Sequence, residues 1–331
     1  MTTLVTGATG FVGSAVVRCL LDAGHQVRVM VRAQSPRTNI QDLDVEIVTA
    51  DLTQTDTLLN AIKGCDILFH VAADYRLWVR DSNVLYRVNV EGTRNLMQAA
   101  IDAGVSKIVY TSSVATLGLK SDGTPADENT PVSFANMIGH YKRSKYLAEQ
   151  AVQQMIAEQN LPAIIVNPST PIGPRDIRPT PTGRMVLDAA CGRMPAYVDT
   201  GLNVVHVDDV AKGHLLALQH GQIGERYILG GHDMTLQQIF DIIADITDRT
   251  APKIKLPHNL VLPIAYLSEA WAWLTRGPEP RATVDGVRMS KKLMYFSSDK
   301  ARQVLGYKPR PADEALSDAI NWFLDHNYCS K

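Results

Sequence analysis

A glycine-rich turn near the N-terminus constrains the fold of this chain more than any other feature of its sequence. Residues 4–32, LVTGATGFVGSAVVRCLLDAGHQVRVMVR, contain a strand, a turn through Gly7, Gly10 and Gly13, a helix and a second strand. Glycine at these places permits a tight turn, close approach of a pyrophosphate to the backbone, and close packing of helix on strand. The free N–H groups at the start of the helix would face the phosphates. The sequence therefore predicts a βαβ unit that binds a dinucleotide.

Apolar runs of strand length alternate with segments of helical periodicity through the first half of the chain. This alternation is typical of a parallel sheet that helices cover on both faces. We therefore predict an α/β fold with a doubly wound sheet of the Rossmann type. The strands are expected near residues 4–6, 27–31, 45–48, 67–71, 108–111 and 163–166, and the helices near residues 13–23, 55–62, 84–103 and 139–159.

A proline-rich segment marks the end of this regular alternation. Residues 167–184, NPSTPIGPRDIRPTPTGR, contain five prolines, so a long regular element is not expected there. We place an NAD(P)-binding domain at residues 1–167. Residues 168–331 are expected to form mainly a smaller α/β lobe that binds substrate, with some segments returning to the first domain.

The charges of the chain are nearly balanced, with 33 Lys and Arg against 34 Asp and Glu. Such a balance produces no long-range field that would favour nucleic acid or an anionic membrane as a partner. The expected partner is a small molecule, and no nucleic-acid binding is predicted.

The four cysteines are scattered as Cys19, Cys65, Cys191 and Cys329. Their spacing matches neither a metal site nor a disulfide framework, so we expect no metal, no disulfide and a reduced protein. The first residues enter an apolar strand without the pattern of a signal peptide. We therefore expect a cytoplasmic location.

The longest apolar stretch, LVLPIAYLSEAWAWL, covers residues 260–274. Pro263, Ser268 and Glu269 interrupt it, and it is shorter than the roughly 20 residues that cross a bilayer. Two interpretations remain: a helix that covers a cleft or a dimer face, and a peripheral contact with a membrane surface.

A tyrosine and a lysine stand four positions apart in GHYKRSK, residues 139–145. On a helix, Tyr141 and Lys145 would share one face, whereas the other three basic side chains of the stretch would point elsewhere. A free phenol titrates near about 10, and a neighbouring ammonium favours the phenolate. We therefore predict that Lys145 lowers the pKa of Tyr141 and makes it usable as an acid or base.

The strand end YTSS, residues 110–113, precedes this helix and supplies hydroxyl groups. Ser113 is one candidate to face Tyr141. Ser112 and Thr111 are alternatives, because a slip of one residue along a strand reverses the face. The resulting hypothesis is hydride transfer with a nicotinamide, in which Tyr141 passes the proton and Ser113 bonds the substrate oxygen. Lys145 would also hold the nicotinamide ribose.

The GxxGxxG spacing, with YxxxK and the strand-end serine, resembles the extended short-chain dehydrogenases/reductases, the NAD-dependent epimerase/dehydratase family. The resemblance implies catalytic roles for Ser113, Tyr141 and Lys145. It implies that the cofactor is bound by Gly7, Thr9, Gly10, Phe11, Val12, Gly13, Asp51, Leu52, Val71, Ala72, Ala73, Thr111, Tyr141, Lys145, Pro168 and Ser169. Asn89 would bridge its helix to the active-site backbone or cap locally.

Arg32 follows the second strand, where an acidic residue would bind the ribose of NAD. A guanidinium fits a 2'-phosphate instead, so we favour NADP(H) as the cofactor. NAD(H) is the alternative if Arg32 is only a solvated strand-end residue.

Segments such as HVAADYRLW, YTSSVATLG and MIGHYKRSK resemble the hopanoid-associated sugar epimerases, and more broadly the dihydroflavonol 4-reductases. The second resemblance implies an NADPH-dependent reductase of a carbonyl group, whereas the first implies a sugar epimerase that retains NAD, in a hopanoid-lipid context. A dinucleotide-binding redox sensor without catalysis is a third hypothesis.

The substrate is expected to be a carbonyl compound, a sugar or a lipid-linked molecule. Its contacts would come from Asp74, Tyr75, Trp78, Arg178 and Arg184. The family resemblance also implies a homodimer, formed through the long helices near residues 84–103 and 139–159.

Overall fold

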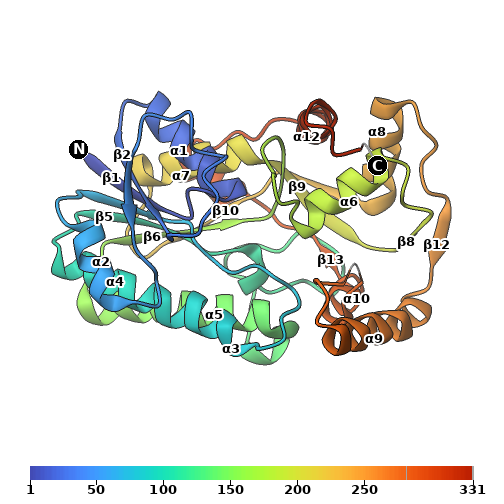
Figure 1. The fold of residues 1–331 in the computed structure, drawn as a ribbon, viewed down its shortest axis with the longest axis horizontal. Helices are drawn as coiled ribbons and strands as arrows, with labels where there is room; N and C mark the ends of the chain where they lie inside the picture. Colours follow the sequence, from blue (N-terminus) through green and yellow to red (C-terminus); the bar gives the residue numbers. More distant parts are fainter. Residues whose placement is uncertain (281, 330–331) are drawn as a thin grey trace.

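A seven-stranded parallel sheet forms the centre of the larger part of the molecule in the computed structural model, which describes residues 1–280 and 282–329 (Figure 1). The strand order is β10-β6-β5-β4-β1-β2-β3. The expected doubly wound α/β fold is confirmed. The strands are β1 (Thr2–Thr6), β2 (Gln26–Val31), β3 (Glu46–Thr49), β4 (Ile67–His70), β5 (Lys107–Thr111), β6 (Ala163–Pro168) and β10 (Arg226–Leu229).

Helices cover both faces of this sheet (Figure 1). Successive strand side chains point to opposite faces, so Val5 packs toward one helical layer and its neighbour Leu4 toward the other. Both are fully buried, which explains why the strands read as continuous apolar runs. One layer consists of α1 (Phe11–Asp22), α7 (Val207–His220) and α11 (Asp299–Leu305), and the other of α2 (Thr55–Ile62), α4 (Gly92–Asp102) and α5 (Gly139–Gln159).

A second, smaller group of elements lies at the carboxyl ends of the strands. It contains the sheet β11-β9-β13, in which β7 also pairs with β9, and the pair β12-β8. A separate apolar core lies between β9, α6, α8 and α12. The elements are β7 (Thr170–Ile172), α6 (Pro181–Ala190), β8 (Ala196–Val198), β9 (Gly201–His206), β11 (His232–Thr235), α8 (Leu236–Thr247), β12 (Ile254–Leu256), α9 (His258–Thr275), α10 (Val284–Met289), β13 (Leu293–Met294) and α12 (Ala312–Asp325).

The helix expected near residues 84–103 is divided. It consists of α3 (Asn83–Tyr86), a π-helical turn, η1 (Arg87–Glu91), and α4. Such a turn inserts an extra residue into a helix and is frequent at functional sites. Two short 3-10 helices, η2 (Val114–Thr116) and η3 (Phe134–Asn136), lie between β5 and α5.

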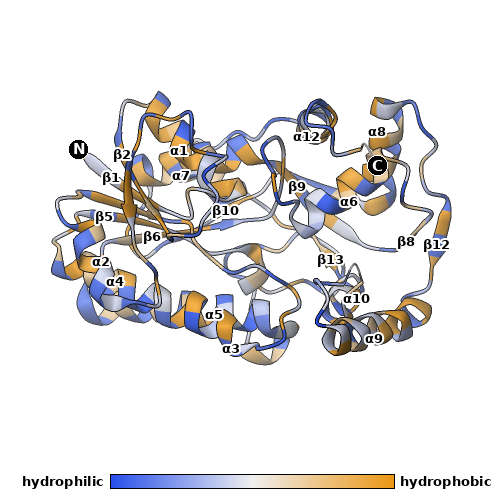
Figure 2. Cartoon of the chain, viewed as in Figure 1, coloured by the Kyte–Doolittle hydropathy of each residue, from blue (hydrophilic) through white to orange (hydrophobic). Residues whose placement is uncertain are grey.

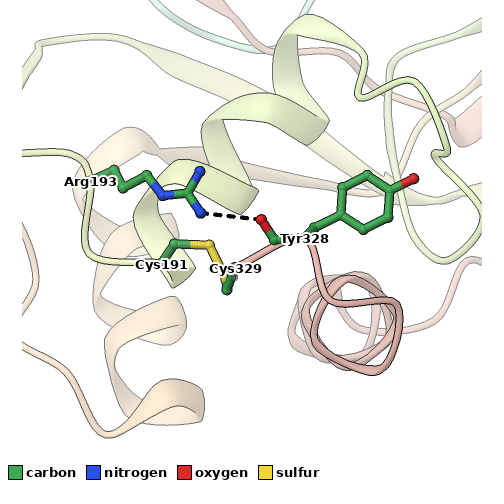
Figure 3. Close-up of a disulfide and its surroundings, with 4 residues drawn as sticks. All are labelled: Cys191, Arg193, Tyr328 and Cys329. Atoms are coloured by element: carbon green, nitrogen blue, oxygen red, sulfur yellow. Dashed lines mark hydrogen bonds between the residues drawn. A yellow bond between two sulfur atoms is a disulfide. The ribbon is translucent and has the colours of Figure 1, made fainter. Parts of the chain in front are cut away.

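The expectation that the cysteines form no disulfide is wrong. Cys191, after α6, is bonded to Cys329, near the end of the chain, with a Cα–Cα distance of 5.4 Å (Figure 3). Beside the bond, Arg193 Nη2 donates to the Tyr328 carbonyl at 3.1 Å. The two cysteines are 138 positions apart, so the local spacing of cysteines gave no signal for the pair. Among the described residues, no helix is long and apolar enough to cross a membrane.

Candidate active site

The glycine turn forms a cradle at the N-terminus of α1. Gly7 has a φ of +70°, and a Cβ there would lie 2.7 Å from the Ala72 nitrogen. A Cβ on Gly13 would lie 2.0 Å from the Gly7 oxygen. Glycine is therefore required at both places. Gly10 is exposed at the N-cap of α1, and no side chain caps its N–H groups. Together with Thr9, Phe11 and Val12, which are half-buried, this uncapped turn provides N–H donors for phosphate oxygens.

The residues expected near the adenosine lie at the carboxyl ends of β2 and β3. Arg32 directly follows β2 and is exposed, and its guanidinium makes no hydrogen bond or ion pair within the described part of the chain. The Asp51 carboxylate accepts from the Thr53 nitrogen at 2.8 Å and the Thr53 hydroxyl at 2.7 Å, so it closes a turn. Leu52 is buried and packs against Gly92.

The residues expected near the nicotinamide follow β4 and β6. Val71, Ala72 and Ala73 are half-buried, and the Ala72 nitrogen donates to Thr6 Oγ1 at 3.2 Å. Pro168 ends β6 and is buried. The hydroxyl of Ser169 is also buried and has no hydrogen-bond partner among the described residues. A buried hydroxyl without a partner is costly, so this group is suited to a ligand.

Ser113 and Tyr141 are brought together at the end of β5. The Ser113 hydroxyl acts on the Tyr141 phenol and opposes the rise of its pKa, and Ser113 Oγ accepts from the Ala115 nitrogen at 3.1 Å. The two alternatives point elsewhere: the Ser112 hydroxyl donates to Glu149, and Thr111 Oγ1 contacts His214 Nε2 at 2.9 Å. Ser113 is thus the hydroxyl of this strand end that reaches the phenol.

The prediction that Lys145 lowers the pKa of Tyr141 is wrong for this structure. Burial raises the pKa of the phenol, and the hydrogen bond from Ser113 is the interaction that opposes the rise. The Lys145 ammonium donates instead to the Thr111 carbonyl at 2.9 Å and lies 5.0 Å from the centre of the Tyr110 ring. Burial lowers the pKa of Lys145 to about 8, against the attraction of Glu149. The phenol is therefore protonated at neutral pH.

A buried carboxylate behind this pair was not predicted. Glu149 is 1% exposed and accepts from the Thr116 hydroxyl at 2.8 Å, the Asn167 amide at 2.9 Å and Arg226 Nη1 at 3.1 Å. Its position could have indicated a role in the site. Glu149 follows Lys145 by four residues, as Lys145 follows Tyr141, and this spacing places side chains on one face of a helix. The network fixes the strand end that carries Ser113.

Asn89 bridges the π-helical turn to the active-site backbone, which is one of its two expected roles. Its Oδ1 accepts from the Asp74 nitrogen at 2.7 Å, and its Nδ2 donates to the Asp74 carbonyl at 2.9 Å. The same amide nitrogen donates to the Ser144 hydroxyl on α5 at 3.0 Å. Asn89 therefore ties the segment after β4 to the helix that carries Tyr141.

The other basic residues of GHYKRSK have separate contacts. His140 Nδ1 lies 3.0 Å from the Tyr86 hydroxyl, and Arg143 donates to the Met137 carbonyl at 3.2 Å. Lys142 and Lys292 line a pocket of about 80 Å³ between α5 and α10. Burial and the charge of Lys292 lower the pKa of Lys142 to about 8.

The expected substrate residues are only partly brought together. Tyr75 is 44% exposed, and burial of its hydroxyl and the charge of Asp176 raise its pKa, while nearby Arg178 opposes the rise. The Asp74 carboxylate is paired with Arg76, so it is already occupied. Trp78 is half-buried and Arg184 is exposed.

Asp176 was not predicted as a site residue, although it lies beside Tyr75. It is 2% exposed and accepts from the Thr180 nitrogen at 2.8 Å and the Thr180 hydroxyl at 2.9 Å. Burial raises its pKa to about 6, against these hydrogen bonds and the charge of Arg184. Asp176, which lies in the same proline-rich segment as Arg178 and Arg184, therefore adds a titratable group to the candidate substrate site.

The NAD dependent epimerase/dehydratase family matches residues 3–230. A protein of Synechocystis sp. with the provisional name dihydroflavonol 4-reductase is 48% identical over 98% of this chain and 95% of its own length. Sterol demethylase protein B of Methylococcus capsulatus is 37% identical over 98% of this chain and 99% of its own. The crystal structure of gox2253 superposes with a TM-score of 0.88 at 60% identity and covers 98% of each chain.

Proposed function

This chain belongs to the NAD-dependent epimerase/dehydratase family, and we propose that it is an NAD(P)-dependent oxidoreductase that reduces a carbonyl group or oxidises the corresponding secondary alcohol. One observation carries the proposal: the Ser113 hydroxyl at the end of β5 acts on the Tyr141 phenol and opposes the rise of its pKa. Two hydroxyl groups in such an arrangement are suited to bind and protonate one substrate oxygen.

The residues present fit a dinucleotide. A side chain on Gly7 or Gly13 would clash with the protein backbone, so glycine keeps the turn tight, and the N-terminus of α1 has no side-chain cap. The partnerless hydroxyl of Ser169 provides a buried polar group at the nicotinamide end. When bound, the nicotinamide supplies or accepts a hydride.

The protonation state of Tyr141 favours carbonyl reduction at neutral pH. Because burial raises its pKa, the phenol holds a proton that it can donate to a carbonyl oxygen. Ser113 would donate a hydrogen bond to the same oxygen. Lys145, held by the Thr111 carbonyl, would bind the nicotinamide ribose with its ammonium group.

We further propose NADP(H) as the preferred cofactor. The exposed Arg32 guanidinium has no partner in the described part of the chain, so it can pair with a 2'-phosphate. The provisional name of the Synechocystis relative, dihydroflavonol 4-reductase, supports reduction as the direction of the reaction.

The substrate class is proposed from the site and the relatives. Tyr75 and Trp78 provide aromatic surface, and the sterol demethylase relative supports a polycyclic or lipid-linked ring ketone, in line with a role in hopanoid lipids. We also propose a homodimer through α4 and α5, for which the family resemblance is the support.

Incubation of the purified protein with NADPH and a panel of ring ketones tests the proposal. Stoichiometric loss of NADPH with formation of an alcohol supports it. An epimerase would instead release tightly held NAD on denaturation and interconvert sugar nucleotides without net loss of cofactor. Cofactor binding with neither reaction would indicate a redox sensor.

A further inference from the structure

Helix α9 is rich in apolar residues (Figure 2). It exposes an apolar face that no part of the described chain covers. The face is defined by Leu260, Ile264, Leu267, Trp271 and Leu274, which recur at intervals of three or four residues and therefore lie along one side of the helix. These side chains are 55% to 72% exposed. Tyr266 and Trp273 are also exposed but lie on another side of the helix, whereas Ala265 and Ala272 are buried.

This arrangement is reversed relative to an ordinary surface helix. The small alanines face the protein, and the largest apolar side chains of the helix face outward. Large contiguous apolar patches are rare on monomeric proteins and mark sites of interaction. On this face Trp271 carries an aromatic ring with a polar N–H group, and such rings favour the boundary between water and lipid.

Cationic side chains surround the ends of α9. They are the exposed Lys253, Lys255, Arg276, Arg288 and Lys291. Three of these are partly engaged. Lys255 pairs with Asp199 at 2.9 Å, Arg288 donates to the Tyr266 hydroxyl at 2.9 Å, and Lys291 donates to Asn259 Oδ1 at 3.3 Å. An exposed cationic rim around an apolar face is complementary to anionic lipid headgroups.

The carboxylates of this region are directed toward the protein. Glu269, on α9, accepts from the Val284 nitrogen at 2.7 Å. Glu279 accepts from the backbone nitrogens of Leu77 and Trp78 at 3.1 and 3.2 Å. Asp285 lies 3.9 Å from Arg288. Because Glu269 and Glu279 are engaged by the backbone, they oppose the attraction between the cationic rim and anionic headgroups less than free carboxylates would.

We propose that the exposed face of α9 docks on the surface of an anionic membrane, with the helix axis in the plane of the interface. The apolar side chains would enter the boundary between headgroups and acyl chains, and the cationic rim would contact the headgroups. The inference stands apart from the reaction assigned above, because it uses none of the catalytic residues.

The docking would place the candidate substrate site beside the lipid. Arg80 Nη2 donates to the Ala272 carbonyl on α9 at 3.3 Å, and the contacts of Glu279 hold the backbone at Leu77 and Trp78. The segment after β4, which carries Tyr75 and Trp78, is thus tied to the C-terminal end of α9. A lipid-linked substrate could then reach the site from the membrane.

Flotation of the full-length protein with vesicles tests the proposal. Vesicles of phosphatidylcholine with about one third phosphatidylglycerol should carry the protein upward, and pure phosphatidylcholine should carry much less. Raising the salt concentration should weaken the binding, because it screens the cationic rim. The fluorescence of Trp271 should shift to shorter wavelength on binding, since its ring leaves water.

The double variant Leu267→Gln/Trp271→Gln should lower the vesicle partition coefficient at least about tenfold, because two large side chains no longer enter the interface. The matched control is Ile223→Gln/Leu324→Gln, which removes two similarly exposed apolar side chains elsewhere and should bind as the wild type does. Arg276→Glu/Lys291→Glu should weaken binding to anionic vesicles alone.

Two results would overturn the proposal. One is a protein that does not float with anionic vesicles at low salt. The other is a dimer in sedimentation equilibrium that becomes a monomer in the Leu267→Gln/Trp271→Gln variant, which would show that a second copy covers the face. Cofactor binding, measured in the same samples, should be unchanged in every variant, so failure here is distinct from failure of the proposed reaction.

Discussion

Lys145 follows Tyr141 by four residues on α5, yet its ammonium donates to the Thr111 carbonyl at 2.9 Å and not to the phenol. The hydrogen bond that counters the raised pKa of Tyr141 comes from Ser113. The proton of Tyr141 is therefore controlled from the strand end, and Lys145 is positioned by the backbone of the same strand.

Replacement of Ser113 by Ala should lower kcat by about 100-fold or more, because one donor to the substrate oxygen is lost. The same change should raise the pKa of Tyr141, since Ser113 lowers it. The alkaline limb of the pH–rate profile for carbonyl reduction should then move to higher pH. Ser133→Ala removes a capping hydroxyl on the surface and serves as the control. A variant with an unshifted profile and full activity would exclude Ser113 from the site.

Replacement of Arg32 by Ala should raise KM for NADPH by about 10-fold to 100-fold and leave KM for NADH nearly unchanged. A charge-assisted hydrogen bond to a 2'-phosphate contributes roughly 1.5–3 kcal/mol, which corresponds to this range. Steady-state kinetics with both cofactors measure the effect, and Arg94→Ala is a matched exposed control. Equal effects on NADPH and NADH would contradict the assignment.

Two glycines of the turn should respond differently to alanine. A Cβ on Gly13 would lie 2.0 Å from the Gly7 oxygen, so Gly13→Ala should lower the free energy of unfolding by about 1–3 kcal/mol or more. A Cβ on Gly10 would lie 3.2 Å from that oxygen and face solvent, so Gly10→Ala should leave stability nearly unchanged while weakening cofactor binding. Thermal denaturation with and without NADPH separates the two effects. The reverse order would show that the cradle is misassigned.

Reduction of the Cys191–Cys329 bond should lower the free energy of unfolding by about 2–5 kcal/mol, because the bond closes a long loop in the unfolded chain. Urea denaturation with and without reductant measures the difference. The Cys191→Ser variant should match the reduced protein, and reductant should not change it further. A protein whose stability is insensitive to reductant would argue against the bond.

Local patterns predicted the sheet, the glycine turn and the helix that carries Tyr141, because each depends on residues close together in the sequence. The partners of Lys145 and the bond between Cys191 and Cys329 depend on contacts between distant segments, which spacing does not encode. The π-helical turn around Asn89 was missed for a related reason: its bonds to Asp74 and Ser144 join three separate elements. Of these unpredicted features, only Glu149 could have been found from local spacing, because it follows Lys145 by four residues on the same helix.

The most direct test of the account is the Tyr141→Phe variant, assayed with NADPH and the best carbonyl substrate of the panel. The account predicts that turnover falls by at least about 100-fold, since the proton donor is lost, while the Kd for NADPH changes little. Phe keeps the ring, so the fold should be preserved, as circular dichroism can verify. Turnover equal to that of the wild type would contradict the assignment of Tyr141 as the proton donor.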